Sequence, residues 1–495
     1  MIDDDQRRTV LRAIREACDV DHAEGEAEGC FLSNYLPLSE HARVLEPGVH
    51  LIVGDRGAGK SELFRAAAIA EARRAIVSLT APGRVPPLNA VSFVVGYSAE
   101  GTWYPAVMQL QGAASGRSPR YLHALWLGLL VRCLAGQELL TRAHSGVDLG
   151  FWQSREAASP ANVTVEVERN LDTIIAEIDT VDEGLARQDR WLCVSYDDLD
   201  RIGAGDWQAL GVIVQGLVQF WSTHVRRWRR IVPKIFLRRD LYDRHALVGA
   251  DVSKLAARRA ELHWTTRDLY AMLLKRIVNG STDLRAYLAG RLPAGVDDRH
   301  LGWWPTSNVE SDYEPAVERL CGLYMGAGPT KGKAFTWIPS HLEDGHGRVV
   351  PRSIVRLFGK AADIELRSAR PRDGRLLQHT SLRNALDAVS ESRIEELVEE
   401  FPWIRRVAAH LSTQTPKLQV PIDLFRFRNV LSAIRWEDTG AEDRAPETTG
   451  AGMLGLLEEL GVVFRRHDGR ADVRDLYMRG FGLKRKGGVS RRPAR

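Results

Sequence analysis

The chain has 495 residues, of which 44% are hydrophobic and 27% charged, and this ordinary globular composition excludes a disordered or fibrous protein. Its 68 basic and 64 acidic residues give a net charge of +4, which is too small for the whole chain to act as a nucleic-acid-binding polycation. The length exceeds what one hydrophobic core usually supports, so we expect two or three domains.

The N-terminal sequence MIDDDQRR is acidic and polar, whereas a secretory signal begins with basic residues followed by apolar ones. No apolar run in the sequence approaches the roughly 18 residues that cross a bilayer. We therefore expect a cytoplasmic protein without membrane contact. The five cysteines are widely spaced and form no C-x-x-C pair, which predicts reduced thiols that mostly fill the core. They are Cys18, Cys30, Cys133, Cys193 and Cys321.

The apolar pattern predicts short buried strands that alternate with helices. Strands separated by helical stretches indicate an α/β fold with a parallel sheet covered by helices on both faces. The expected strands are residues 48–53, 91–95, 191–196 and 233–237. The expected helices are residues 7–17, a helix from residue 61, 121–134, 163–178 and 207–221, and the chain after Trp264 is expected to be helical, as in a lid.

The sequence GDRGAGKS matches the pattern G-x-x-x-x-G-K-[ST], with an apolar run before it and a helix-forming run after it. Glycines in this pattern let backbone N–H groups approach phosphate oxygens, and the following helix N-terminus adds a positive dipole. Lys60 is expected to contact the β- and γ-phosphates of ATP, and the Ser61 hydroxyl to bind Mg²⁺. A glycine-rich turn that only caps a helix is the alternative, but it would not need Lys and Ser there. The predicted nucleotide-binding residues are Gly54, Asp55, Arg56, Gly57, Ala58, Gly59, Lys60, Ser61 and Glu62.

Acidic residues follow the predicted strand WLCVSY. A carboxylate at the end of a second buried strand commonly completes the Mg²⁺ shell of such a site. Asp197 is the predicted metal partner, and Asp198 the predicted catalytic carboxylate that polarises the attacking water. Asp200 is a third candidate. The alternative is that these acids cap the next helix and face solvent.

Two arginines end the strand KIFLRR, at the carboxyl edge where open α/β sheets bind ligands. Arg238 is predicted to reach the γ-phosphate and act in catalysis, with Arg239 as the fallback because adjacent strand residues face opposite sides. The alternative for Arg238 is a surface ion pair with Asp240 or Asp243. Arg352 follows a proline at a predicted helix start and is a candidate to contact phosphate from a lid, the alternative being an ordinary helix-surface charge.

The C-terminal sequence predicts a short amphipathic helix and then two strand-like runs around a turn at Asp468 and Gly469. Helix and hairpin in this order suit a winged helix. Basic residues cluster at the end, as a surface for DNA phosphates would require. A protein-docking wing with a solvated tail is the alternative. The basic residues are Lys484, Arg485, Lys486, Arg491, Arg492 and Arg495.

Together, GDRGAGKS, VSYDDLD, KIFLRRD, SKLAARRAELHWTTRDLYAMLLKRI and VVPRSIVRLFGKA resemble the motifs of bacterial P-loop ATPases of the AAA+/STAND type. The sequence looks closest to the origin-recognition-like branch, in which an ATPase core and a helical lid precede a winged-helix module. The resemblance implies the first sensor position for Arg238, the second for Arg352, and the acidic pair for Asp197 and Asp198. This pair is Asp-Asp where many relatives have Asp-Glu, so the shorter carboxylate is expected to position water less well.

Four parts of the chain are expected. Residues 291–329 are rich in Gly, Pro, Asp and Trp without a clear period, and we interpret them as an insertion or long loop. Residues 437–450 are rich in acidic residues, Gly, Pro and Thr, and we interpret them as a mobile linker or loop. The four parts are an N-terminal helical segment (1–30), a P-loop ATPase core (31–262), a helical lid with the insertion (263–375), and a helical, winged-helix-like region with a basic tail (376–495).

These residues predict an ATPase that binds ATP and Mg²⁺ and works as a conformational switch. The resemblance implies a regulatory role, with defence against phage or mobile DNA as one such role, and assembly with itself or a partner protein. In such an assembly a neighbour supplies an arginine, for which Arg258 and Arg259 are candidates. The competing functions are a DNA-binding loader or remodelling ATPase, with DNA bound by the C-terminal basic region, and a small-molecule P-loop kinase.

Overall fold

The chain divides into two compact units. Residues 22–263 form one, which we call the sheet unit, and residues 1–21 with 264–495 form the other, the helical unit. None of the described helices combines the length and the apolar character needed to cross a membrane. The computed structural model describes residues 3–19, 27–99, 103–114, 117–140, 146–203, 207–243, 255, 257–368, 375–414, 418–437, 440 and 443–486.

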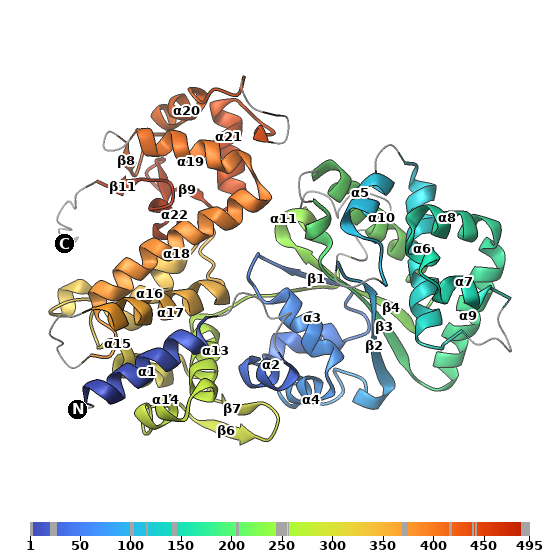
Figure 1. The fold of residues 1–495 in the computed structure, drawn as a ribbon, viewed down its shortest axis with the longest axis horizontal. Helices are drawn as coiled ribbons and strands as arrows, with labels where there is room; N and C mark the ends of the chain where they lie inside the picture. Colours follow the sequence, from blue (N-terminus) through green and yellow to red (C-terminus); the bar gives the residue numbers. More distant parts are fainter. Residues whose placement is uncertain are drawn as a thin grey trace. The chain divides into compact units, whose positions relative to one another are not determined.

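A parallel five-stranded sheet organises the sheet unit, with the strand order β2-β3-β4-β1-β5 (Figure 1). Because β4 lies between β1 and β3, the residues that follow these three strands meet at one edge of the sheet. The predicted α/β fold class is confirmed. The strands are β1 (Leu51–Gly54), β2 (Val91–Tyr97), β3 (Trp191–Tyr196), β4 (Ile231–Arg238) and β5 (Arg259–Glu261).

Side chains of the strands alternate between two hydrophobic cores, one on each face of the sheet. Leu51 and Val53 pack into the larger core, and Ile52 packs into the smaller one. Helices α5 (Val107–Ala114), α6 (Pro119–Gly136) and α10 (Trp207–His224) cover the larger core, and α2 (Glu28–Asn34), η2 (Ser39–Leu45), α3 (Lys60–Ala68) and α4 (Ala70–Ser78) cover the smaller one.

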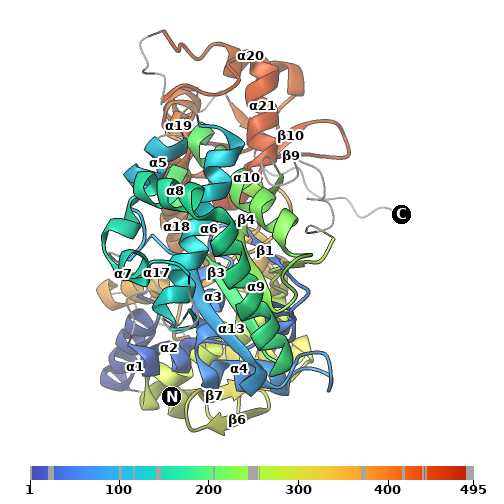
Figure 2. The same cartoon turned by 90° about the vertical axis from the view of Figure 1, so that its right-hand side faces the viewer.

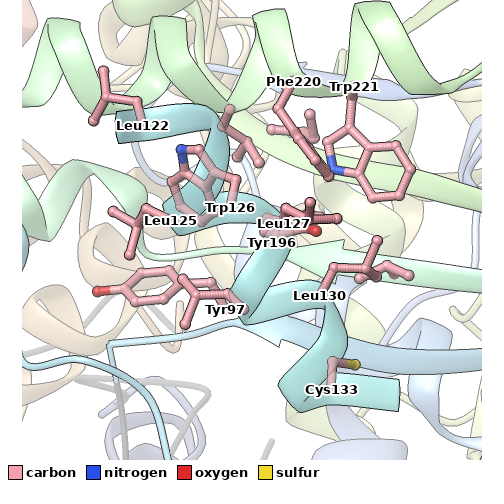
Figure 3. Packing of buried hydrophobic residues seen from close by; sticks show 14 of the residues in the cluster. Tyr97, Leu122, Leu125, Trp126, Leu127, Leu130, Cys133, Tyr196, Phe220 and Trp221 are labelled. Atoms are coloured by element: carbon pink, nitrogen blue, oxygen red, sulfur yellow. The ribbon is translucent and has the colours of Figure 1, made fainter. Parts of the chain in front are cut away.

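An aromatic row crosses the larger core (Figure 3). Tyr97 meets Trp126 edge-on with ring centroids 6.2 Å apart, and Trp126 meets Tyr196 at 5.8 Å. Tyr196 then meets Trp221 of α10 at 6.2 Å. Such large buried rings contribute much of the stabilising apolar burial of a core. Since Tyr97 and Tyr196 are the last residues of β2 and β3, the row fixes the ends of both strands.

Three further helices are inserted before β3: α7 (Leu149–Gln153), α8 (Pro160–Arg169) and α9 (Leu171–Arg187). The prediction of one helix over residues 163–178 is wrong, because the chain leaves the helical conformation at Asn170 (φ −121°, ψ 24°). The Asn170 amide donates to the Glu166 carboxylate at 2.6 Å, and such local side-chain bonds compete with helix continuation.

The four predicted strands are confirmed, although β1 begins at Leu51, later than expected. β5 was not predicted, because its three residues carry no apolar run and it exists through pairing with β1. All five cysteines are free, and only Cys30 is exposed.

The helical unit begins with α1 (Asp4–Ala17), which packs against α13 (Thr266–Gly280) and α17 (Pro351–Arg367). Arg7 of α1 donates to the Glu365 carboxylate and to the Leu376 carbonyl, both at 2.7 Å. The interpretation of residues 291–329 as a long loop is wrong. That stretch contains β6 (Gly295–Asp298), β7 (Gly302–Pro305) and α15 (Glu314–Cys321), elements too short for a sequence period to appear. The remaining helices before residue 401 are α14 (Thr282–Tyr287), α16 (Ala334–Leu342) and α18 (His379–Glu400).

The C-terminal module comprises α19 (Trp403–Thr413), β8 (Gln419–Val420), α20 (Leu424–Ser432), α21 (Gly450–Glu459), β9 (Val463–Arg465), β10 (Ala471–Val473), α22 (Asp475–Met478) and β11 (Lys484–Arg485). The predicted hairpin is confirmed: β9 and β10 pair antiparallel beside α21 (Figure 2). Ile422 exchanges backbone hydrogen bonds with Ala471 at 2.8 and 2.9 Å, which adds a third strand-like segment to the hairpin. Residues 438, 439, 441 and 442 of the predicted linker lie outside the described residues, as do Arg491, Arg492 and Arg495.

Candidate nucleotide-binding site

The glycine-rich loop runs from the end of β1 into α3. Gly57 and Gly59 adopt φ values of 80° and 88°, in the left-handed region that residues with a Cβ atom avoid. Gly59 is the N-cap of α3, and no side chain caps this helix end. The first backbone N–H groups of α3 therefore remain available to an anion held in the loop.

Lys60 is the first residue of α3, and its ammonium lies over the loop. It donates to the carbonyl oxygens of Gly54 at 3.2 Å and Asp55 at 3.0 Å. Burial lowers the pKa of Lys60, and the nearby carboxylates of Asp200 and Asp197 oppose this effect. The half-buried lysine is thus held against the loop, close to these carboxylates.

Asp197 directly follows β3 and is 5% exposed. Its pKa is raised to about 7, chiefly by burial and then by the neighbouring Asp198 carboxylate, while a hydrogen bond with the Ser61 side chain acts in the opposite direction. The structure therefore brings together the two oxygen donors that the sequence predicted as Mg²⁺ ligands. A serine hydroxyl and a buried carboxylate fit this ion, which prefers oxygen ligands.

The part of the chain that the structure describes holds no group of three or more His, Cys, Asp or Glu side chains able to hold a metal.

Asp198 has a backbone φ of 58°, which is uncommon for a residue other than glycine and costs roughly 1–3 kcal/mol. Its carboxylate accepts a hydrogen bond from the Ser98 hydroxyl at 3.0 Å and lies 3.4 Å from Arg201 Nε. The Asp198 charge, after burial, also raises the pKa of Tyr97. Asp198 is 8% exposed, so it does not simply cap a helix in solvent.

Arg238 ends β4 between the phosphate loop and the acidic residues, and it is 6% exposed. Its guanidinium donates to both oxygens of Asp240, at 3.1 and 2.7 Å, and lies 3.7 Å from Asp200. Its charge is close enough to lower the pKa of Lys60 further. The ion pair with Asp240 is therefore present, but it is buried beside the loop and not on the surface.

Arg239 points to different partners. Its Nε lies 3.4 Å from Asp55 of the loop, and its guanidinium donates to Glu261 of β5 at 3.0 Å. Arg239 is thus suited to hold the loop. Glu62 is close enough to Tyr35 for its charge, after burial, to raise the pKa of that residue.

Arg352 belongs to the helical unit, whereas the glycine-rich loop belongs to the sheet unit. It lies 3.6 Å from Glu396, which also pairs with Arg356 and, at 2.7 Å, with Arg393. In the sheet unit, Arg259 donates to Glu261 at 2.7 Å.

Four residues of this cluster were not assigned a site role from the sequence: Ser98, Arg201, Tyr97 and Asp240. Asp240 could have been recognised, because it follows Arg238 by two residues. Ser98 follows a strand that is adjacent to β3 only in the folded sheet.

Comparisons with known proteins return solved structures only. No family model matches the chain, and no curated protein matches it. Similar solved structures include a Walker-type ATPase of Pyrococcus abyssi, with 13% identity and a TM-score of 0.37 over 91% of this chain and 99% of that chain. Another is Cdc6p of Pyrobaculum aerophilum, with 13% identity and a TM-score of 0.30 over 93% of this chain and 94% of that chain. A third is the ORC2 protein of Aeropyrum pernix in its ADPNP-ADP complexes, with 13% identity and a TM-score of 0.37 over 90% of this chain and 93% of that chain. These likenesses are too distant to assign residues, so the site rests on the geometry of this chain.

Proposed function

We propose that the sheet unit binds Mg²⁺-ATP and hydrolyses it, and that the chain works as an ATP-dependent conformational switch. The observation that carries this proposal is the meeting of Ser61, at the end of the glycine-rich loop, with the buried Asp197, directly after β3. It joins the residue types that bind Mg²⁺ at the mouth of a loop whose glycines suit phosphate.

Each residue has a task in this proposal. The loop N–H groups and the Lys60 ammonium neutralise phosphate charge, and Lys60 leaves its two carbonyl partners to do so. Ser61 and Asp197 hold Mg²⁺. ATP supplies the phosphoanhydride bond whose γ-phosphoryl group is transferred to water. Asp198 orients that water and accepts its proton.

Arg238 is proposed to exchange Asp240 for the γ-phosphate. A bidentate carboxylate partner is a good stand-in for phosphate, because guanidinium binds both in the same geometry. In the helical unit, Arg352 is proposed to act from the lid, and Glu396 would compete for it.

The test is phosphate release by purified protein with and without Mg²⁺, together with nucleotide binding measured by calorimetry. We expect Mg²⁺-dependent binding of ATP and slow turnover, since the short Asp198 side chain is already engaged by Ser98 and Arg201. The proposal would be contradicted if the protein bound no nucleotide, or if the rate of phosphate release were the same with and without Mg²⁺.

Self-assembly with an arginine from a neighbour is a further proposal, tested by specific activity across a dilution series together with mass by light scattering. Constant mass and constant specific activity would favour a monomeric switch. Arg259 is a poorer candidate for such a role, because Glu261 and Tyr242 hold its guanidinium.

A second candidate function is a nucleic-acid loader or remodeller. The element order of the C-terminal module favours this function. The module has a helix, a short strand, two helices and a hairpin, and Ile422, just after the short strand, is bonded to the hairpin. This is the order of a winged helix. Turnover stimulated by DNA would support this function. Defence against mobile DNA and a cytoplasmic location stay hypotheses.

A further inference from the structure

The helices of the C-terminal module carry very different charges. The sequences of α19 and α20 contain four arginines and no carboxylate. The sequence of α21 contains two glutamates and no basic residue. The helix that precedes the hairpin is therefore the one least suited to a polyanion, and the basic side chains lie on α19 and α20. The four arginines are Arg405, Arg406, Arg426 and Arg428.

The arginines of the β9–β10 hairpin are already neutralised. Arg465 donates to Glu458 at 2.7 and 3.1 Å, and Arg466 lies 3.2 Å from Asp472. Arg470 donates to Asp468 at 2.6 Å. A phosphate group would have to displace a carboxylate at each of these positions.

The arginines of α19 differ. Within the described ranges of the chain, no carboxylate forms an ion pair with Arg405 or Arg406. The Arg406 guanidinium instead lies over the Trp436 ring, 5.9 Å from its centroid. A cation on an aromatic face keeps its charge and remains able to bind an anion.

A groove of about 450 Å³ separates α19 from α20, and a hydrogen-bond contact of 3.0 Å between His410 Nε2 and the Val430 carbonyl joins the helices beneath it. Arg406 precedes His410 by one helical turn and so shares its side of α19. Phe425 lines the groove and is 73% exposed, the only aromatic ring among the large apolar side chains described as exposed. Arg426 lies beside it on the groove wall.

We propose that this α19–α20 groove binds single-stranded nucleic acid. An exposed ring next to arginines is what such a strand requires, because a base stacks on the ring while guanidinium groups contact the phosphates on either side. Phe425 is the stacking residue, and Arg406 is the phosphate contact. The proposal concerns an effector surface and does not depend on ATP hydrolysis.

The experiment measures binding of a fluorescein-labelled 20-nucleotide oligothymidine to the full chain by anisotropy, without nucleotide and at low salt. Phe425→Ala should weaken this binding about 10-fold or more, and Phe425→Trp should restore it. The same Phe425→Ala change should alter binding of a duplex of equal length much less. Arg406→Gln should lower the slope of log affinity against log salt by about 0.7, the value for one contact to a single strand.

Arg465→Gln is the matched control, because it removes an arginine of the same module that Glu458 already neutralises. It should leave oligothymidine binding unchanged. Absence of binding by the wild type, equal loss in Arg465→Gln, or no effect of Phe425→Ala would each overturn the proposal. Competition by polyglutamate as strong as by the oligonucleotide would also overturn it, in favour of an acidic protein partner. ATP binding by the Phe425→Ala variant checks the nucleotide site separately.

Discussion

A buried carboxylate of the helical unit has matched partners, whereas a buried carboxylate of the sheet unit lies among like charges. In the helical unit, the two oxygens of Glu365 accept bonds from Arg7 at 2.7 Å, from the Gln378 backbone at 3.0 Å and from Ser381 at 2.7 Å. In the sheet unit, Asp197 lies beside two further carboxylates, which helps to raise its pKa to about 7.

This difference separates structural charges from functional ones. A buried ion pair is costly to break, because removing one partner leaves an uncompensated charge. A buried carboxylate beside like charges is instead destabilising until a cation arrives. Substitutions should therefore have opposite effects on stability in the two units, and large effects on chemistry in only one.

The largest effect is expected from Lys60→Ala, which should reduce ATP turnover roughly 10³-fold or more, as loss of a charged phosphate ligand does elsewhere. Phosphate release at saturating Mg²⁺-ATP measures it. Lys234→Met is the matched control: Lys234 is also buried in the sheet unit, but it donates to the Glu46 and Val49 carbonyls at 2.5 and 2.6 Å. Full turnover by a folded Lys60→Ala variant would refute the loop assignment.

Glu365→Ala should destabilise the helical unit by about 3–5 kcal/mol, because Arg7 is left buried without its partner. Denaturant unfolding followed by circular dichroism measures the change. Glu395→Ala, at an exposed position of the same unit, should change stability by less than about 0.5 kcal/mol. Equal effects of the two substitutions would mean that the buried pair is not structural.

Asp197→Asn should change the free energy of unfolding in the opposite direction to Glu365→Ala, because it should stabilise the Mg²⁺-free protein. The folded-state pKa of about 7 exceeds the ordinary value of 3.8, so folding favours the protonated carboxyl and stability falls as pH rises between these values. The variant should exceed the wild type by up to about 4 kcal/mol at pH 8 and by little near pH 4.

Unfolding of both proteins at several pH values measures this difference, with Asp172→Asn, at an exposed position of the sheet unit, as control. A constant difference across pH would mean that Asp197 titrates normally. The same substitution should weaken the Mg²⁺ dependence of nucleotide binding.

Asp198→Asn should have the smallest effect, slowing turnover by roughly 10²-fold while Mg²⁺-ATP stays bound. Asparagine tolerates the positive φ of this position, so the backbone should persist. Turnover and nucleotide affinity measured together separate the two steps. Identical behaviour of Asp198→Asn and Asp197→Asn would show that the two carboxylates have no separate roles.

The sequence alone was enough to predict the parts that depend on local pattern. Apolar runs predicted β2, β3 and β4, because a buried parallel strand is apolar along its length. The spacing of glycines before Lys60 predicted a tight loop between β1 and α3, because the left-handed conformations at Gly57 and Gly59 need residues without a Cβ atom.

Only the tertiary structure decided which side chains meet. β4 lies between β1 and β3, and this order brings Arg238 beside Lys60 and Asp200 although the three residues are far apart in the sequence. The pairing of β2 with β3 brings Ser98 to Asp198. β5 forms by pairing with β1, although its sequence contains no apolar run from which a strand could be predicted. The physical reason is that strand order and ion-pair choice are set by packing between distant segments, whereas a sequence pattern reports only on neighbours along the chain.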